Sequence, residues 1–303
     1  MNAMNHSAKS ADAADSQCPL SIVIRTLDCA STLQEVLTQI KPRPDDRLIV
    51  VDSGSKDGTL TVAEQFGALT VKIRPEEFTY GRSLNVGFAR ASGDWVLSLS
   101  SHCMPTRPDF LDQYRRAVRR FPANLAAAVG PIVYSELDRK LGSGITLYEL
   151  EDFDAGFGFG AGNPNCLYRL ALWQQRSFDE QIPGAEDMEW YVWALRQGAC
   201  LGAVHAADVL YVSQRPLGAL YRKGRLDYRV SSQFIHPHQP RLSVVGTHLA
   251  KLLLYMFWGR IRWSQAARSF ANYLGSYMES RVHHGQSEKW FDSGGKWDTR
   301  VGK

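Results

Sequence analysis

A polar cluster with metal-competent side chains follows an apolar run in the first third of the chain. Trp95-Val-Leu-Ser-Leu99 is typical of a short buried strand, and Ser100, Ser101, His102 and Cys103 follow it directly. Pro105 and Pro108 prevent the strand from continuing. Open α/β sheets bind ligands at the carboxyl ends of their strands, so this cluster is a candidate ligand site. A polar turn with a buried thiol explains these residues equally well when they are taken alone.

A second candidate is the loop Asp52-Ser-Gly-Ser-Lys-Asp-Gly-Thr59, which leaves a predicted strand at 46–51. A carboxylate at a strand end accepts hydrogen bonds from a ribose or a base N–H, and glycine lets a ligand approach the backbone closely. The alternative is a solvated turn. The chain contains neither a G-x-G-x-x-G string after a strand nor a P-loop, so dinucleotide-binding and kinase classes have no support here.

A third candidate is the carboxylate pair Glu186-Asp187 near the start of a predicted helix at 184–198. An apolar environment raises the pKa of a carboxyl group, and Trp190 and Trp193 are close in sequence. Acidic residues also favour helix N-termini because they complement the helix dipole, which is the simpler explanation of the pair by itself.

The elements that must position these groups alternate between strand and helix. Leu33, Val36, Leu37 and Ile40 form the apolar stripe of a surface helix directly after the β-branched run at 20–24. Alternation of this kind predicts an α/β fold, a doubly wound, mainly parallel sheet with helices on both faces. The other predicted strands lie at 46–51, 68–73, 95–99 and 126–134, and the other predicted helices at 59–66, 83–91, 108–120, 170–175 and 184–198.

Composition and charge limit the classes of protein that fit. The chain has 303 residues, 44% hydrophobic and 22% charged, with a formal net charge of +4, which is typical of a globular protein. This dispersed basic excess does not predict a nucleic-acid partner, but it suits an anionic substrate or a negatively charged membrane surface. Five widely spaced cysteines without a C-x-x-C pair favour a reducing compartment, hence a cytoplasmic protein.

Three segments are expected along the chain. Residues 1–18 resemble a disordered leader without an apolar signal region, residues 19–235 form the main domain with halves at 19–105 and 106–235, and residues 236–303 form a helical C-terminal extension with a polar tail. The apolar stretch 242–258 suits either an interfacial amphipathic helix or a core helix. The first alternative predicts peripheral contact with the inner face of the cell membrane; no stretch is long and apolar enough to span it.

The chain resembles the inverting GT-A glycosyltransferases of family 2, in particular bacterial rhamnosyltransferase-like members, over roughly residues 19–230. The resemblance rests on Ser21-Ile-Val-Ile-Arg-Thr26, Val51-Asp-Ser-Gly-Ser-Lys-Asp-Gly-Thr59, Phe78-Thr-Tyr-Gly-Arg-Ser-Leu-Asn-Val-Gly87 and Ala91-Ser-Gly-Asp94, and continues through Asn163 and Arg169 to Glu186-Asp187. It implies a GT-A fold and roles for particular residues. Thr26 and Asp52 would hold the base and ribose, Asp57 and Arg82 would lie near the nucleotide or its phosphates, Asn85, Asp94 and Ser100 would support the sugar-nucleotide pocket, and Asp187 of the acidic pair would be the general base.

The chain departs from the family where a D-x-D motif normally binds Mg²⁺ or Mn²⁺, because these positions read Ser100-Ser101-His102. Three alternatives remain: His102 binds a cation already chelated by the diphosphate, contacts the diphosphate as a cation itself, or marks a degenerate site. Related members also carry a His near 212–214, which is absent here, and His205, His236 and His238 are candidates by proximity. A group of basic residues either neutralises phosphates or forms a solvated surface. Its members are Arg215, Arg222, Lys223, Arg225 and Arg229.

The resemblance therefore predicts an inverting glycosyltransferase that uses a UDP-, GDP- or dTDP-sugar and a cell-surface glycan or lipid-linked acceptor, with a divalent cation. One alternative is a catalytically degenerate subunit that binds nucleotide-sugars. The other is a nucleotidyltransferase, which usually has a Gly-rich loop after its first strand; the turn Arg25-Thr-Leu-Asp-Cys-Ala30 contains no glycine.

Overall fold

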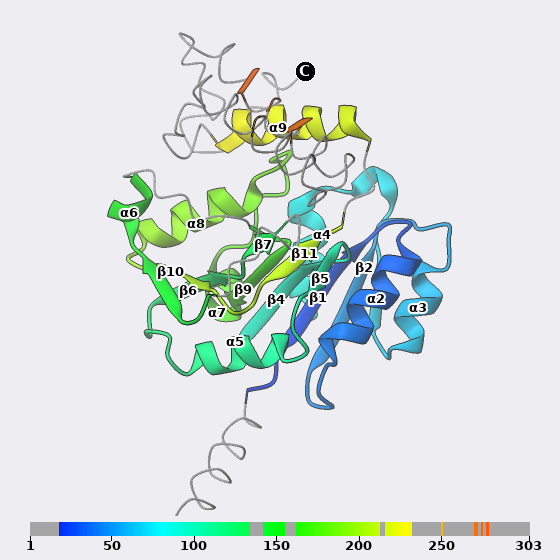
Figure 1. The fold of residues 1–303 in the computed structure, drawn as a ribbon, viewed down its shortest axis with the longest axis horizontal. Coiled ribbons are helices and arrows are strands. Elements are labelled where there is room, and N and C mark those ends of the chain that lie inside the picture. Colours follow the sequence, from blue (N-terminus) through cyan, green and yellow to red (C-terminus); the bar gives the residue numbers. More distant parts are fainter. Residues whose placement is uncertain are drawn as a thin grey trace, which may run out of the picture.

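The computed structural model describes residues 18–133, 142–154, 162–212 and 216–231, and a few single residues between 250 and 278 (Figure 1). Most of the predicted leader at 1–18, of the Gly- and Phe-rich stretch at 153–162 and of the predicted extension at 236–303 lies outside the described residues. The apolar stretch 242–258 is therefore outside them too, except for residue 250. Within the described residues, every helix is too short or too polar to cross a bilayer.

The centre of the molecule is an eight-stranded sheet of order β3-β2-β1-β4-β9-β6-β10-β8. Six strands run parallel to one another, and β9 and β8 run opposite to their neighbours. The predicted mainly parallel α/β fold is confirmed. The strands are β1 (Ser21–Thr26), β2 (Arg47–Asp52), β3 (Leu69–Lys72), β4 (Trp95–Ser100), β6 (Leu125–Val129), β8 (Ile145–Tyr148), β9 (Asn165–Arg169) and β10 (Cys200–Val204).

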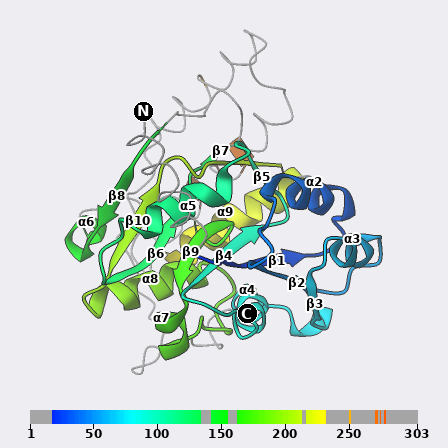
Figure 2. The same ribbon diagram turned by 90° about the horizontal axis from the view of Figure 1, so that it is seen from below.

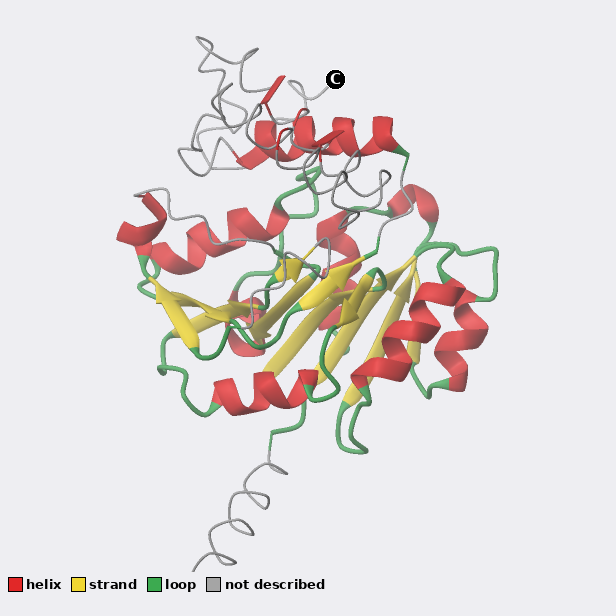
Figure 3. Ribbon diagram, in the orientation of Figure 1, coloured by secondary structure: helices red, strands yellow, loops and turns green. Residues whose placement is uncertain are grey.

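Helices cover both faces of this sheet (Figures 2 and 3). Ile22 and Ile24 of β1 belong to a core with α2 (Ala30–Ile40), α3 (Thr59–Gln65) and α5 (Phe110–Val118). Val23, between them, belongs to the opposite core with α4 (Tyr80–Phe88), α7 (Leu170–Gln175) and α8 (Glu186–Arg196). Successive side chains of a strand point to opposite faces, so a continuous apolar run such as β1 is buried on both sides. The remaining helices are the 3₁₀ turn η1 (Pro75–Glu77), α6 (Leu150–Asp154) and α9 (Leu217–Ser231).

Two predicted element boundaries differ from the structure because of a second, three-stranded sheet of order β5-β11-β7. After β4 the chain turns at 101–102 and enters β5 (Cys103–Pro105), which pairs with β11 (Val209–Tyr211). The strand predicted at 126–134 is divided at Gly130-Pro131 into β6 and β7 (Ile132–Val133). A methyl group on Gly130 would lie 2.1 Å from the carbonyl oxygen of Ala207, so the chain can change sheets only where this residue is glycine.

Candidate functional site

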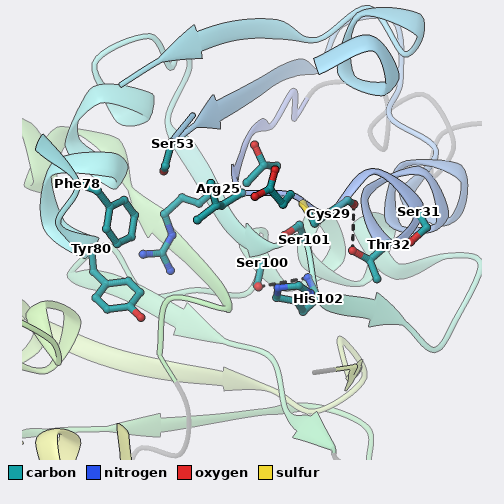
Figure 4. Close-up of a pocket in the computed structure, with 13 residues that line it drawn as sticks. Arg25, Cys29, Ser31, Thr32, Ser53, Phe78, Tyr80, Ser100, Ser101 and His102 are labelled. Carbon is teal, nitrogen blue, oxygen red and sulfur yellow. Dashed lines mark hydrogen bonds between the residues drawn. The ribbon is translucent and has the colours of Figure 1, made fainter. Parts of the chain in front are cut away.

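A pocket of about 410 Å³ lies at the edge of the sheet where β1, β2 and β4 end (Figure 4). These strands are parallel and adjacent, so their carboxyl ends meet there, as expected for a ligand site in an open α/β sheet. The lining includes Arg25, Thr26, Ser53, Tyr80, Ser100 and His102. The structure thus brings together the end of the first strand and the Ser-Ser-His cluster, two of the predicted site segments.

The loop after β1 and the loop after β2 are joined by hydrogen bonds on one side of this pocket. Asp28 accepts from Lys56 N at 2.7 Å, and its own N–H donates to Ser55 Oγ at 2.9 Å. Asp57 accepts from Ala30 N at 3.0 Å and from Thr59 N at 2.9 Å. Although desolvation opposes it, the hydrogen bonds from Thr59 and Ala30 lower the pKa of Asp57. Asp57 is thus an ionised link between two loops, exposed at their surface.

Asp52 shapes the second loop from inside. Its carboxylate is 1% exposed and accepts from Thr26 Oγ1 at 3.1 Å and from the N–H groups of Gly54 and Ser55, both at 3.0 Å. Gly54 has φ +96°, which favours glycine. Thr26 lines the pocket, whereas Asp52 lies behind it, and its role toward a base or ribose stays a prediction.

The strand end at Ser100 and His102 offers few ligands for a cation. Ser100 N donates to Pro164 O at 2.9 Å, and His102 O accepts from Val212 N at 2.8 Å, which fixes the turn between the two sheets. Two hydroxyls and one imidazole replace carboxylates here, and the described residues contain no cluster of three His, Cys, Asp or Glu side chains. Mg²⁺ and Mn²⁺ prefer oxygen ligands. These residues therefore fit only a cation whose other ligands come from a bound diphosphate.

The acidic pair at the start of α8 is held by one residue, Asn163. Its side-chain Nδ2 donates to Glu186 Oε1 at 2.6 Å, and its backbone N donates to Asp187 Oδ2 at 2.8 Å. Tyr168 OH donates to Asn163 Oδ1 at 2.6 Å, and Ser98 Oγ donates to Asn163 O at 2.6 Å. The carboxylates are thereby connected to β4 and β9. Sequence analysis included Asn163 in the resemblance but gave it no role.

Burial raises the pKa values of both carboxyl groups. Desolvation, followed by the charge of Asp187, raises the pKa of Glu186 to about 7, against the opposing charge of Arg25. Desolvation also raises the pKa of Asp187, opposed by the hydrogen bonds from Asn163 and Met188 and by the charge of Lys223. Lys223 belongs to α9, which also packs against the residues before the pair: Val230 contacts the cluster around Ile182. A first-turn carboxylate that only complements the helix dipole needs no burial, so the dipole alone does not explain this pair.

Arg25 connects the pocket to the acidic pair and was not assigned a role from the sequence. It is the fifth residue of β1, its Nη1 lies 3.9 Å from Glu186 Oε1, and its guanidinium lies 5.2 Å from the ring centre of Tyr80. The available signal was a basic residue inside an otherwise apolar strand, one position before the predicted ligand turn. A charged residue in that position is rarely buried unless it faces a polar partner or a ligand.

Arg82 and Asn85 lie on α4 and bind protein groups. Arg82 Nη1 donates to Glu180 Oε2 at 3.2 Å. Asn85 Nδ2 donates to Phe178 O at 2.9 Å and to Glu180 Oε1 at 3.0 Å, and Asn85 Oδ1 accepts from Trp173 Nε1 and Phe178 N. Asn85 uses both donors and both acceptor sites of its amide in this way. These bonds fix α4 against the segment at 178–180, and a role of Asn85 in the sugar-nucleotide pocket stays a prediction.

Asp94 does not reach the pocket, contrary to the expectation that it supports it. It is exposed and precedes the first residue of β4, whereas the pocket lies at the last residue, Ser100. Six residues of extended strand separate the two ends by about 20 Å. The resemblance placed Asp94 at the pocket, whereas the extended strand between Asp94 and Ser100 puts it at the opposite end of β4.

The other candidate histidines and basic residues have separate positions. His205 Nε2 lies 2.8 Å from Thr146 Oγ1 of β8, away from the pocket lining, and His236, His238 and Arg215 are outside the described residues. In the predicted basic group, Lys223 forms an ion pair with Asp227, at 2.5 Å, and its charge acts on Asp187. A role of this group in binding phosphate stays a prediction.

A mainly parallel sheet with a pocket at its carboxyl edge, a second small sheet and a buried acidic pair beside the pocket defines the GT-A class of α/β proteins. Residues 21–179 match the family described as glycosyl transferase family 2. This match covers more than half of the chain, and the protein belongs to that family.

Solved structures share this fold, and a sequence relative matches part of the chain. A mannosyltransferase from Pyrobaculum calidifontis, solved with GDP-Man and Mn²⁺, is 14% identical, with 88% of this chain and 87% of that one covered and a TM-score of 0.58. Glucosyl-3-phosphoglycerate synthase from Mycobacterium tuberculosis, solved with phosphoglyceric acid, is 23% identical, with coverages of 73% and 79% and a TM-score of 0.52. A TPR repeat-containing protein from Synechococcus elongatus is 36% identical over 90 residues, which span 29% of this chain and 21% of that protein. The structures establish a shared fold.

Proposed function

We propose that this protein is an inverting glycosyltransferase that moves a sugar from a nucleotide-sugar to an acceptor hydroxyl. One observation carries the proposal: an acidic pair, buried at Glu186 and half-buried at Asp187, has raised pKa values and meets the pocket at the carboxyl edge of the sheet through Arg25. Transfer requires a base for the acceptor and charge stabilisation for the leaving group in adjacent positions. Membership of glycosyl transferase family 2 supports the reaction class.

Asp187 is the proposed general base. Its carboxylate takes the proton of the acceptor hydroxyl as that oxygen attacks the anomeric carbon, while the bond from this carbon to the diphosphate breaks. A single displacement of this kind inverts the anomeric centre. Desolvation raises the pKa of Asp187 and so makes it a stronger base than an exposed aspartate. Glu186 places a second carboxyl group next to that of Asp187.

The donor is proposed to be a UDP-, GDP- or dTDP-sugar with its nucleotide along the loops after β1 and β2. Thr26 and Ser53 line the pocket there, and Asp52 and Asp57 hold the two loops in shape. A divalent cation, Mn²⁺ or Mg²⁺, would be held by His102 together with the donor diphosphate and would act as a Lewis acid for the leaving group. Structures with the same fold contain GDP-Man with Mn²⁺, or UDP with Mg²⁺.

The acceptor is proposed to be a cell-surface glycan or a lipid-linked glycan, as in the rhamnosyltransferase-like members that the sequence resembles. The basic helix α9 supports an acceptor that carries phosphate, because it brings Lys223 toward Asp187 and also bears Arg222, Arg225 and Arg229. The cytoplasmic location expected from the cysteines agrees with the use of a nucleotide-sugar.

A donor panel tests this function. Release of nucleoside diphosphate from UDP-glucose, GDP-mannose and dTDP-rhamnose is measured with Mn²⁺, with and without added acceptor glycolipid, for the wild type and for Asp187→Asn. One donor is expected to be consumed by the wild type and spared by the variant. Binding of a nucleoside diphosphate without any turnover would instead favour the degenerate, donor-binding subunit.

A further inference from the structure

The end of β4 offers the pocket no carboxylate that could hold a divalent cation. The lining there consists of Ser100, Ser101 and His102, and the pocket's two ionic side chains are Arg25, near the end of β1, and Asp28, in the loop after it. Asp28 already accepts a hydrogen bond from the backbone of Lys56. A diphosphate group carries several negative charges, so neighbouring carboxylates would repel it unless the pocket also contains a cationic group.

The guanidinium of Arg25 is placed inside this pocket without a full set of partners. Its Nη1 is buried and has no hydrogen-bond partner among the described residues, and the side chain as a whole is 15% exposed. The distance of 3.9 Å to Glu186 Oε1 is longer than a hydrogen bond. Figure 4 shows the side chain extending between the rings of Phe78 and Tyr80 and the strand end at Ser100.

Glu186 is not a fixed counterion of Arg25. Its Oε1 already accepts the short hydrogen bond from Asn163 Nδ2, at 2.6 Å. Burial raises the pKa of Glu186 to about 7, so near neutral pH this carboxyl group is protonated for part of the time. A buried N–H group without an acceptor is costly, and the cost is removed when a ligand oxygen arrives.

We infer that Arg25 binds the diphosphate of the donor directly and so supplies, from the protein itself, positive charge that a carboxylate-bound cation would otherwise have to bring. The planar guanidinium has a fork of N–H donors that matches two phosphate oxygens at once, and its charge does not titrate. The stacked position over Tyr80 keeps the fork pointed into the pocket. The inference deepens the proposed function, on which it rests, and makes donor binding only partly dependent on a divalent cation.

The test measures affinity, so it does not depend on an unidentified acceptor. UDP, GDP and dTDP are titrated calorimetrically into the full chain, in EDTA and in Mn²⁺, and the tightest of the three is used for the variants. Arg25→Gln removes the charge at similar size, and Arg25→Lys keeps the charge but loses the fork. Arg90→Gln is the matched control, since Arg90 is exposed after α4 and does not line the pocket. Thermal melting of each variant checks that it is folded.

A direct contact predicts that Arg25→Gln weakens binding about 10-fold to 100-fold in EDTA as well as in Mn²⁺, the range of a charge-assisted hydrogen bond. Arg25→Lys should lose less, and Arg90→Gln should match the wild type. A second variant, Glu186→Gln, separates this contact from a structural role, because removing the neighbouring carboxylate should leave the affinity equal or tighter.

Two results would overturn the inference while leaving the proposed function intact: unchanged affinity in Arg25→Gln, or an equal loss in Glu186→Gln, which would mean that Arg25 acts through its carboxylate neighbour. Failure of the wild type to bind any of the three nucleoside diphosphates, with or without Mn²⁺, would overturn the proposed function together with the inference.

Discussion

Gly162 lies against the carboxylate of Asp187 so closely that a methyl group at position 162 would be 1.5 Å from Oδ2. The backbone before β9 therefore determines where this carboxylate sits. Gly162→Ala should displace Asp187 and reduce transfer by about 100-fold, the cost of misplacing a catalytic group by about 1 Å, while the affinity for nucleoside diphosphate stays the same. Steady-state kinetics with calorimetric titration measure both quantities.

The control for this substitution is Gly218→Ala. A methyl group there would lie 3.6 Å from Arg222 Nη1, an ordinary contact on a helix, so activity should be retained. Full activity in Gly162→Ala would show that Asp187 can move without consequence, contrary to its proposed role.

Asp187→Asn should abolish base catalysis but keep the shape of the site. Asn at this position can still accept the hydrogen bond from Asn163 N, so nucleotide affinity should change little. Loss of a general base is expected to reduce kcat by about 100-fold to 10,000-fold. Turnover assays and nucleotide titration on the same preparation check the two parts. A loss of affinity that equals the loss of turnover would point to a binding role instead.

Asn163→Ala should uncouple Glu186 from Tyr168 of β9, while the backbone of residue 163 still bonds Asp187 and Ser98. Its side chain donates to Glu186 and accepts from Tyr168, so truncation leaves buried polar groups without partners and lowers stability by about 1–3 kcal/mol. The pH profile of kcat should also shift, since a lost hydrogen bond to a carboxylate raises its pKa. Urea unfolding and a pH series measure these effects.

Asn124→Ala is the comparison for Asn163→Ala, because Asn124 is exposed and its side chain bonds only groups remote from the acidic pair, donating from Nδ2 to Gly198 O and accepting a long hydrogen bond from Cys200 Sγ. Asn124→Ala should leave the pH profile of kcat unchanged, and it should lower the stability by less than Asn163→Ala does. An unshifted profile in Asn163→Ala would contradict the positioning role of Asn163.

The buried carboxyl of Glu186 predicts a specific dependence of stability on pH. Its pKa is raised from an ordinary 4.5 to about 7, first by desolvation and then by Asp187, so the folded state binds the proton more tightly than the unfolded chain does. This stabilisation is complete below pH 4.5 and is lost as the pH rises to about 7. The stability gained by Glu186→Gln relative to wild type should grow across that window by on the order of 3 kcal/mol.

Urea unfolding at intervals between pH 4 and pH 8 measures this difference, with Glu35→Gln, an exposed residue of α2, as the control. If Glu186→Gln and wild type follow parallel curves, the carboxyl group is not protonated preferentially in the folded state.

His102→Ala should separate the cation from the rest of the donor site. As the imidazole is the only His, Asp or Glu side chain at the end of β4 in the described pocket, its loss should remove most of the gain in nucleotide affinity that Mn²⁺ provides. The affinity in EDTA should remain, because Arg25 is intact. Titrations with and without Mn²⁺ give both values. His205→Ala, which loses only the contact with Thr146, should behave as wild type; an undiminished Mn²⁺ effect in His102→Ala would refute the assignment.

Much of the fold could be predicted because it depends on local pattern. The stripe of Leu33, Val36, Leu37 and Ile40 forms the buried face of α2, and the apolar runs of β1, β2 and β4 are buried strands of one sheet. β9 was missed because Asn165–Arg169 is short, and its strand conformation comes from pairing with β4 on one side and β6 on the other. Pairing partners distant in sequence leave no periodic signal.

The candidate site was predicted only in part. Thr26, Ser100 and His102 line the pocket, since residues at the ends of parallel strands meet at one edge. Asp94, which the resemblance placed at the pocket, lies at the other end of β4, because an extended strand separates it from Ser100. Arg25 and Asn163 received no role, because the meaning of each depends on a partner more than 20 residues away.

By itself the sequence determined most of the helices and the parallel strands of the N-terminal half, the family to which the chain belongs, and the replacement of the acidic motif by Ser100-Ser101-His102. Only the tertiary structure decided that Arg25 lies between the pocket and Glu186, and that Asn163 and Gly162 hold the acidic pair. The physical reason is that burial and long-range contacts, which raise the pKa of a carboxyl or leave a guanidinium N–H without an acceptor, exist only once distant segments have packed together.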